Sequence, residues 1–376
     1  MVRVLQITDK GPKGGGIRQV VETHCDLLAA RNCSCTRLYL GSQANADTYN
    51  APTKVARHLP ENDPALVALR AAAQDVDVIH LHLGFLSLSP DFVSTAARLA
   101  PLVTNLHDIS PFEDPPRQVT PLRDRLSQRI LRPVRRALWQ QICTLSSRII
   151  TPSHYLAERA IAAGVSPSKI TILPHPLAHC AQKQSPPSQH PPTILYAGLL
   201  AEEKGASLLL EAFSLIKAPT ARLVYMGDGP QTDALVSRAN HLGLSDRVKF
   251  TGQVAPAAVY QQMADMRVLA HPSLIAEGFG LVGIEAMQHG RPVVGFGTGG
   301  AVDWLIHEQT GLIAAPQTAQ GLANALDRIL ADADLADRLG AQARDFVEKT
   351  FSRQTIGDKL MAIMTQPCGG ATEAAR

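Results

Sequence analysis

The sequence predicts an α/β protein of two doubly wound domains, each with a parallel sheet that helices cover on both faces. The chain has 376 residues, more than one typical hydrophobic core holds, so two domains of roughly 150 to 200 residues are expected. Short β-branched runs alternate with helical patterns through most of the chain. A proline-rich stretch near the middle interrupts this alternation, which then starts again.

The first domain is predicted over residues 1–178. Residues 2–8 form an alternating, β-branched strand, and Gly14, Gly15 and Gly16 then lead into a segment whose apolar residues have helical spacing. Further strands are predicted at residues 76–82, 102–106 and 148–151, with helices between them. This alternation is typical of a parallel sheet.

Residues 179–192 are predicted to be a linker, since they lie in a stretch with four prolines and no periodicity. The second domain is predicted over residues 193–350. Its strands are expected at residues 194–197, 222–226, 248–250, 268–270 and 292–296, and its helices at 206–216, 231–242, 321–332 and 335–351, with another from about Leu281. A helix at about 351–365 is expected to pack on the first domain, and residues 366–376 to be disordered.

The composition is that of an ordinary globular protein, with 45% hydrophobic and 18% charged residues. A net charge of +3 is too small to favour nucleic acid as a partner. The six cysteines show no CxxC pair and no spacing typical of zinc, so reduced thiols in a cytoplasmic protein are expected. We expect no signal peptide, and no membrane-spanning helix because uninterrupted apolar runs of about 18 residues are absent from the sequence.

Glu277 and Glu285 are the strongest pair of candidate site residues. Glu277 is expected in a loop after a strand, and Glu285 about one turn inside a helix that is apolar on every side. A carboxylate there is costly without a partner, and the start of such a helix favours phosphate oxygens. The amides expected at this start belong to Phe279, Gly280, Leu281 and Val282. Alternatively, Glu285 only complements the helix dipole and Glu277 only starts a turn.

Several motifs accompany these glutamates along the chain. They are Gly227-Asp228-Gly229-Pro230, Phe250-Thr251-Gly252, Gly290-Arg291-Pro292-Val293-Val294, Gly299-Gly300 and Thr310-Gly311-Leu312. The chain resembles family 4 of the retaining glycosyltransferases in these motifs and in their order. It also has that family's two glutamates separated by seven residues. The resemblance implies the GT-B fold, in which two Rossmann-like domains face an interdomain cleft. It also implies transfer of a sugar from a nucleotide diphosphate sugar to a hydroxyl of a glycan, a lipid-linked acceptor or a small molecule.

The resemblance assigns catalytic roles to Lys204, His107 and Glu277. Lys204 matches the family lysine that neutralises the donor diphosphate, a role suited to a compact ammonium group. His107 ends a predicted strand and matches a histidine that contacts the donor sugar, which Glu277 would also face. Outside the family context, Lys204 would be a solvated surface charge and His107 a structural hydrogen bonder. Glu285 is expected to bind the ribose hydroxyls.

Gly15 and Gly16 match a family loop near the donor phosphates, and Gly198 and Val254 are further expected donor contacts. The loop lacks the G-x-G-x-x-G pattern, so NAD binding is not indicated. Leu199 departs from the family, which often has arginine at that position. Losing such a contact to the diphosphate costs about 1.5 to 3 kcal/mol unless another cation replaces it. A nucleotide-sugar-binding protein with weak or no transferase activity is therefore an alternative, as is a GT-B hydrolase or epimerase.

We expect no cofactor and no catalytic metal, because a lysine and a helix start can supply the charge stabilisation. Asp75-Val76-Asp77 has the D-x-D form of metal-dependent transferases, but it falls where a helix ends and a strand begins. Residues 117–148, from Arg117 to Arg148, form a basic amphipathic pattern suited to the anionic inner face of a membrane or to an anionic acceptor, although a solvated helix face explains it as well. Pro133 is expected to kink or split this helix.

Overall fold

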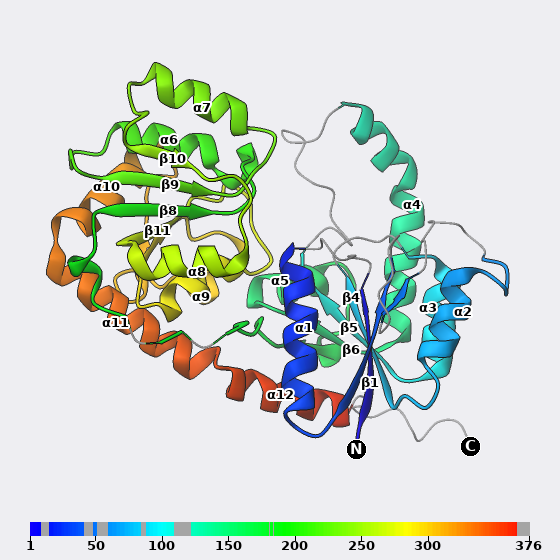
Figure 1. The fold of residues 1–376 in the computed structure, drawn as a ribbon. Coiled ribbons are helices and arrows are strands. Elements are labelled where there is room, and N and C mark those ends of the chain that lie inside the picture. Colours follow the sequence, from blue (N-terminus) through cyan, green and yellow to red (C-terminus); the bar gives the residue numbers. More distant parts are fainter. Residues whose placement is uncertain are drawn as a thin grey trace. The chain divides into compact units, whose positions relative to one another are not determined.

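The computed structural model forms two compact units. Unit 1 comprises Met1–Ala178 and Arg353–Arg376, and unit 2 comprises His179–Ser352 (Figure 1). The structure describes residues 1–8, 15–40, 48–50, 59–83, 88–108, 122–179, 181–182 and 184–366, and for 48–50 and 122–132 it describes the backbone only. The predicted disordered tail lies outside the described residues except for Gln366.

Unit 1 contains a parallel sheet of seven strands within the described residues, in the order β3-β2-β1-β4-β5-β6-β7. The strands are β1 (Arg3–Thr8), β2 (Ser34–Tyr39), β3 (Thr48–Asn50), β4 (Val78–Leu83), β5 (Leu102–Leu106), β6 (Ser146–Thr151) and β7 (Ile170–Ile172). The strand order reverses between β1 and β4. Ligands of open parallel sheets bind at such a point.

Helices cover both faces of this sheet (Figure 1). They are α1 (Gly15–Ala29), α2 (Pro64–Ala72), α3 (Pro90–Leu99), α4 (Leu122–Leu145), α5 (His154–Ala162) and α12 (Arg353–Thr365), with a short 3-10 helix, η1 (Pro167–Lys169). One core joins α1 and α12 to the sheet through residues such as Leu28, Val78 and Leu360. The opposite core includes Leu69 of α2, Phe92 of α3 and their neighbours. The C-terminal helix is therefore part of unit 1.

The helix of the basic segment is one continuous element, which corrects part of the sequence prediction. Pro133 lies inside α4 and does not split it. Because proline removes only one backbone donor, the remaining turns of this long helix keep their hydrogen bonds. Packing of Leu138 and Trp139 into the core fixes its second half. Arg117 lies outside the described residues.

Unit 2 contains a second parallel sheet, of six strands within the described residues, in the order β10-β9-β8-β11-β12-β13. Its strands are β8 (Thr193–Ala197), β9 (Arg222–Met226), β10 (Val248–Phe250), β11 (Val268–His271), β12 (Val293–Gly295) and β13 (Gly311–Ile313). Its helices are α6 (Ala206–Ser214), α7 (Thr232–His241), α8 (Pro256–Asp265), α9 (Leu281–Gln288), α10 (Ala319–Ala331) and α11 (Ala333–Thr350), with the 3-10 helices η2 (Pro187–Gln189), η3 (Glu202–Lys204) and η4 (Gly299–Asp303). Here the order reverses between β8 and β11, so both units have the doubly wound topology that the sequence predicts.

Within the segment predicted as a linker, residues 184–192 are held on unit 2 by polar contacts. The backbone N–H of Ser188 donates to Asp337 over 2.8 Å, and the guanidinium of Arg291 donates to the carbonyl of Ser185 over 2.9 Å. Arg267 donates to the carbonyl of His190 over 2.6 Å. These contacts explain why so polar and proline-rich a segment is ordered against the unit.

Candidate functional site

The candidate site lies in unit 2, where the loops after β8 and β11 meet. The reversal of strand order makes these two strands neighbours, so their following loops emerge side by side. The first loop leads into η3 and Lys204, and the second contains Glu277. Lys204 Nζ lies 3.0 Å from Glu277 Oε1, and the side chains are 30% and 18% exposed. The fold therefore brings together the predicted lysine and the first predicted glutamate.

Glu277 is ionised in this setting. Burial alone would raise the pKa of Glu277, but His271, Lys204 and a hydrogen bond from Ser273 together outweigh it and hold that pKa at about 2. Burial lowers the pKa of His271, against the opposing effect of Glu277. The loop thus carries a permanent negative charge beside one ammonium group near neutral pH.

Backbone contacts hold the two loops to each other and to η4. The N–H of Leu274 donates to the carbonyl of Glu203 over 2.9 Å, and the N–H of Gly300 donates to the carbonyl of Glu277 over 2.8 Å. Gly205 has a φ of +72°, and a Cβ there would lie 2.0 Å from the carbonyl oxygen of Pro272. Only glycine allows this close approach, so Lys204 is positioned by backbone packing as well as by its charge.

The start of α9 lies a few residues beyond Glu277. Gly280 precedes the helix with a φ of +87°, and no side chain caps the helix. Trp304 holds the turn, because its Nε1–H donates to the carbonyl of Phe279 over 2.6 Å. The first amides of α9, those of Leu281 and Val282, form a partly positive helix end, as the sequence predicts.

Glu285 lies inside α9 and is 8% exposed. Tyr260 Oη donates to Glu285 Oε1 over 3.2 Å. The next turn is fixed by His289, whose Nδ1–H donates to the backbone carbonyl of Glu285 over 2.8 Å. The buried carboxylate therefore has a polar partner, as its burial requires.

The remaining predicted residues are distributed over both units. Gly198 follows β8, where its N–H donates to the carbonyl of Met226 over 2.9 Å, and Val254 lies between β10 and α8. Leu199 is 51% exposed. Gly15, with a φ of +56°, and Gly16 are exposed at the start of α1 in unit 1.

His107 follows β5 in unit 1 and is 8% exposed. Its Nε2 lies 3.0 Å from His82 Nδ1 and 3.3 Å from Asn105 Nδ2. Burial holds the pKa of His107 well below its usual value, with nearby histidines adding to the effect. The imidazole is therefore neutral near pH 7.

The D-x-D sequence is engaged by a neighbouring cation. Asp77 accepts hydrogen bonds from the backbone and side chain of Arg3, at 2.8 and 3.2 Å, and Asp75 lies 3.9 Å from the same guanidinium. This pairing with Arg3 supports a structural role for the two aspartates, at the start of β4, over a role as metal ligands. Among the helices of the described residues, none is long and apolar enough to cross a membrane.

Three residues of the site are not identified by sequence analysis: His271, Tyr260 and Trp304. His271 ends β11 and has a buried Nε2 without a hydrogen-bond partner in the structure. His271 stands at a strand end, before Pro272, and a strand-end position is also what marks His107 as a candidate in the sequence. Tyr260 and Trp304 have no comparable signal, because long-range packing brings them to α9.

Comparison with known proteins agrees with this architecture. The model of the Glycosyltransferase Family 4 matches residues 14–178, and that of the group 1 glycosyl transferases matches residues 181–346. The GDP-mannose-dependent alpha-(1-6)-phosphatidylinositol monomannoside mannosyltransferase of Mycobacterium tuberculosis is 25% identical over 379 residues, which are 96% of this chain and 97% of that protein. The alpha-D-kanosaminyltransferase of Streptomyces kanamyceticus is 29% identical over 174 residues, covering 46% of this chain and 45% of that protein.

Solved structures share the fold over the full length. An Anabaena protein in complex with UDP and glucose has a TM-score of 0.76 at 21% identity, covering 97% of this chain and 100% of that one. The sucrose-phosphate synthase of Thermosynechococcus elongatus has a TM-score of 0.75 at 22% identity, covering 97% and 99%. With the two doubly wound units and the paired glutamates, these matches show that the chain belongs to glycosyltransferase family 4, GT-B enzymes that transfer a sugar from a nucleotide sugar.

Proposed function

We propose that the protein transfers a hexosyl or related sugar with retention of anomeric configuration and without a metal ion in the transfer step. The observation that carries this proposal is the ion pair of Lys204 and Glu277 beside the start of α9. One ammonium group and one uncapped helix end suit the two phosphates of a nucleoside diphosphate. The same arrangement supplies the charge stabilisation for which other transferases use a divalent ion.

In the proposed reaction, the bond between the anomeric carbon and the diphosphate oxygen breaks, and that oxygen keeps the electron pair. The acceptor hydroxyl forms a new bond to the anomeric carbon on the same face and passes its proton to a donor phosphate oxygen. Lys204 and the α9 amides stabilise the charge that grows on the diphosphate. We assign the sugar to Glu277 and His107 and the ribose to Glu285, following the family resemblance.

Two relatives indicate which donors to test first. The mycobacterial relative uses GDP-mannose, and the Anabaena structure contains UDP and glucose. A thermal-shift screen of nucleotide diphosphate sugars on the wild type and on Glu285→Ala tests the site. We expect a donor to raise the melting temperature of the wild type more than that of the variant, because the variant lacks the acceptor for ribose hydroxyls. Equal ligand-induced shifts would show that Glu285 does not bind the ribose.

The reaction itself is tested by proton NMR of the product, where the anomeric coupling constant shows retention or inversion. A transfer rate unchanged by added Mg²⁺ or Mn²⁺ after chelation supports metal-independent transfer. Free sugar or a rearranged sugar nucleotide formed without an acceptor would instead indicate a hydrolase or an epimerase.

A nucleotide-sugar-binding protein with weak activity is the second candidate, because Leu199 is an exposed apolar side chain where many family members have arginine. Donor binding without turnover across a broad acceptor panel would favour this function. Substituting Leu199→Arg should then raise the transfer rate, since a guanidinium adds a charge-assisted contact to the diphosphate.

We also propose that α4 contacts an anionic membrane face, which suits a lipid-linked acceptor. Arg136 is exposed on the described part of this helix. Flotation with vesicles containing anionic lipid should recover the protein at low salt and not at high salt. Equal recovery with neutral vesicles would contradict the electrostatic contact.

A further inference from the structure

Five buried histidines line one region of unit 1, and their rings follow one another in space. His24 comes from α1, His80 and His82 from β4, His107 from the end of β5, and His175 from the segment after β7. Successive ring centroids are 5.5, 4.2, 5.2 and 4.9 Å apart. A protein core that binds no metal seldom contains so many imidazole rings, because apolar side chains fill a core without leaving ring nitrogens unpaired.

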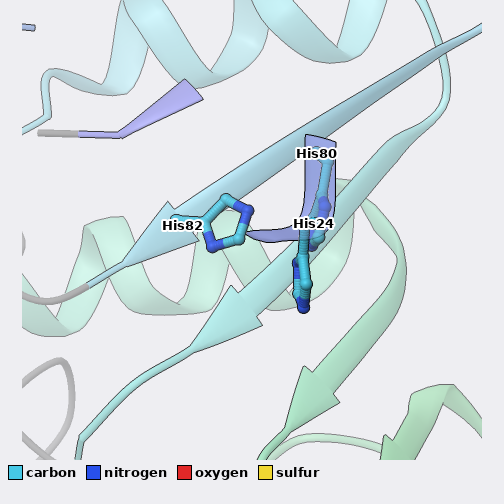
Figure 2. A group of neighbouring side chains, drawn as sticks. All are labelled: His24, His80 and His82. Carbon is cyan, nitrogen blue, oxygen red and sulfur yellow. The ribbon is translucent and has the colours of Figure 1, made fainter. Parts of the chain in front are cut away.

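His24, His80 and His82, here called the histidine cluster, lie closest to a common point (Figure 2). One ring nitrogen from each lies within 4.8 Å of one from each of the others. His80 and His82 are two residues apart on β4, so both side chains point to the face of the sheet that α1 covers. His24 faces them from that helix, and the three are 0 to 1% exposed.

Both ring nitrogens of His24 and both of His80 lack a hydrogen-bond partner in the structure. Burying a polar group without a hydrogen-bond partner destabilises the fold. A neutral imidazole keeps one lone pair, which is the form that binds metals.

One ring nitrogen of His82 is hydrogen-bonded to another side chain, an outer contact that is common for a histidine that binds a metal through its other ring nitrogen. Its Nε2 lies 2.6 Å from Gln6 Oε1, and an amide oxygen only accepts, so Nε2 carries the proton and Nδ1 keeps the lone pair. Nδ1 now lies 3.0 Å from His107 Nε2, a contact that a bound ion would replace. Gln6 is itself 1% exposed.

We propose that the histidine cluster binds a zinc-class transition-metal ion, Zn²⁺ first among them, in the interior of unit 1. Three neutral imidazoles, with water as the fourth ligand, are a ligand set that zinc accepts, whereas Mg²⁺ and Ca²⁺ prefer oxygen. Nitrogens at the usual zinc distance in a tetrahedral site are about 3.4 Å apart, so the rings rotate slightly on binding. The ion lies beside His107, the residue of unit 1 that the proposed reaction assigns to the sugar, and its binding stabilises the fold of unit 1.

Metal loading of the full-length protein, free of any histidine tag, tests the proposal. After dialysis against Zn²⁺ and gel filtration, mass spectrometry should find about one zinc per chain, and zinc should raise the melting temperature. His24→Leu and His80→Leu should lose both effects. His241→Gln, which changes an exposed histidine on α7 of unit 2, should keep them. A wild type that holds no zinc, or a His24→Leu variant that holds as much as the wild type, would overturn the site.

Two further measurements do not depend on how well a ligand variant folds. Wild-type protein loaded with Co²⁺ should show the intense visible d–d bands of tetrahedral coordination. Gln6→Leu keeps all three ligands but removes the outer contact of His82, so it should weaken zinc binding about 10- to 100-fold in competition with a chelator. Weak octahedral bands, or an unchanged affinity in Gln6→Leu, would contradict the proposed geometry.

Discussion

At the residue scale, the ion pair of Lys204 and Glu277 connects the loops that follow two neighbouring strands. Substituting Lys204→Met keeps most of the side-chain volume but leaves Glu277 without its cation and removes a charge from the proposed diphosphate site. We expect the transfer rate to fall on the order of 100-fold and the free energy of unfolding to fall by about 1 to 3 kcal/mol. Lys249→Met, on the exposed side of β10, is the matched control and should change neither quantity. Equal activity of both variants would remove Lys204 from the catalytic site.

Because the pKa of Glu277 is low, the stabilisation that its ion pair with Lys204 gives to the fold depends on pH in one direction. In the unfolded chain this carboxyl takes up a proton near its ordinary pKa of 4.5, whereas in the folded protein it does so near 2. Its stabilising effect is therefore complete above pH 4.5 and is lost as the pH falls from there towards 2. Urea unfolding should show a constant difference between wild type and Lys204→Met from pH 7 to about 5, and a smaller one below 4.5. A difference that grows on acidification would show that Lys204 does not act by stabilising ionised Glu277.

At the scale of elements, α9 depends on close contact with Trp304. A Cβ added at Gly283 would lie 2.2 Å from the indole ring, so Gly283→Ala should destabilise unit 2 by about 1 to 3 kcal/mol. Trp304→Phe should also destabilise it, because the carbonyl of Phe279 loses its donor. The double variant should be more stable than the sum of the two effects predicts, since the smaller ring makes room for the methyl group. Strict additivity in urea unfolding would argue against the contact.

The same elements show what the sequence predicts and what it leaves open. Strong local patterns locate most long strands, and the apolar run there predicts a helix from about Leu281, where α9 begins. Strand β2 and the three-residue strands β3, β7 and β13 are missed. The three-residue strands are too short to show a periodicity, and their partners on neighbouring strands define them. Tyr260 reaches Glu285 only through the packing of α8 near α9, so no local pattern identifies it. The site residues themselves become neighbours because the topology places β8 beside β11.

At the scale of the whole molecule, the chain crosses from one core to the other and back. Residues up to Ala178 build unit 1, the next 174 residues, from His179 to Ser352, build unit 2, and α12 completes the core of unit 1. A last helix that packs on the first domain is also the expectation stated from the sequence. Because each unit has its own core, the stability of each can be changed by substituting one buried leucine.

The two tryptophans of the chain lie in different units and report each one separately, since Trp139 is buried in unit 1 and Trp304 in unit 2. Leu360 of α12 is fully buried, so Leu360→Ala should lower the stability of unit 1 by about 2 to 5 kcal/mol. Leu339→Ala, an equally buried position on α11, should lower that of unit 2 instead.

Each substitution is made in Trp304→Phe and in Trp139→Phe, and urea unfolding is followed by the fluorescence of the remaining indole. We expect Leu360→Ala to shift the Trp139 transition more than the Trp304 transition, and Leu339→Ala to do the reverse. Equal shifts of both indoles in both variants would show that the two units unfold as one.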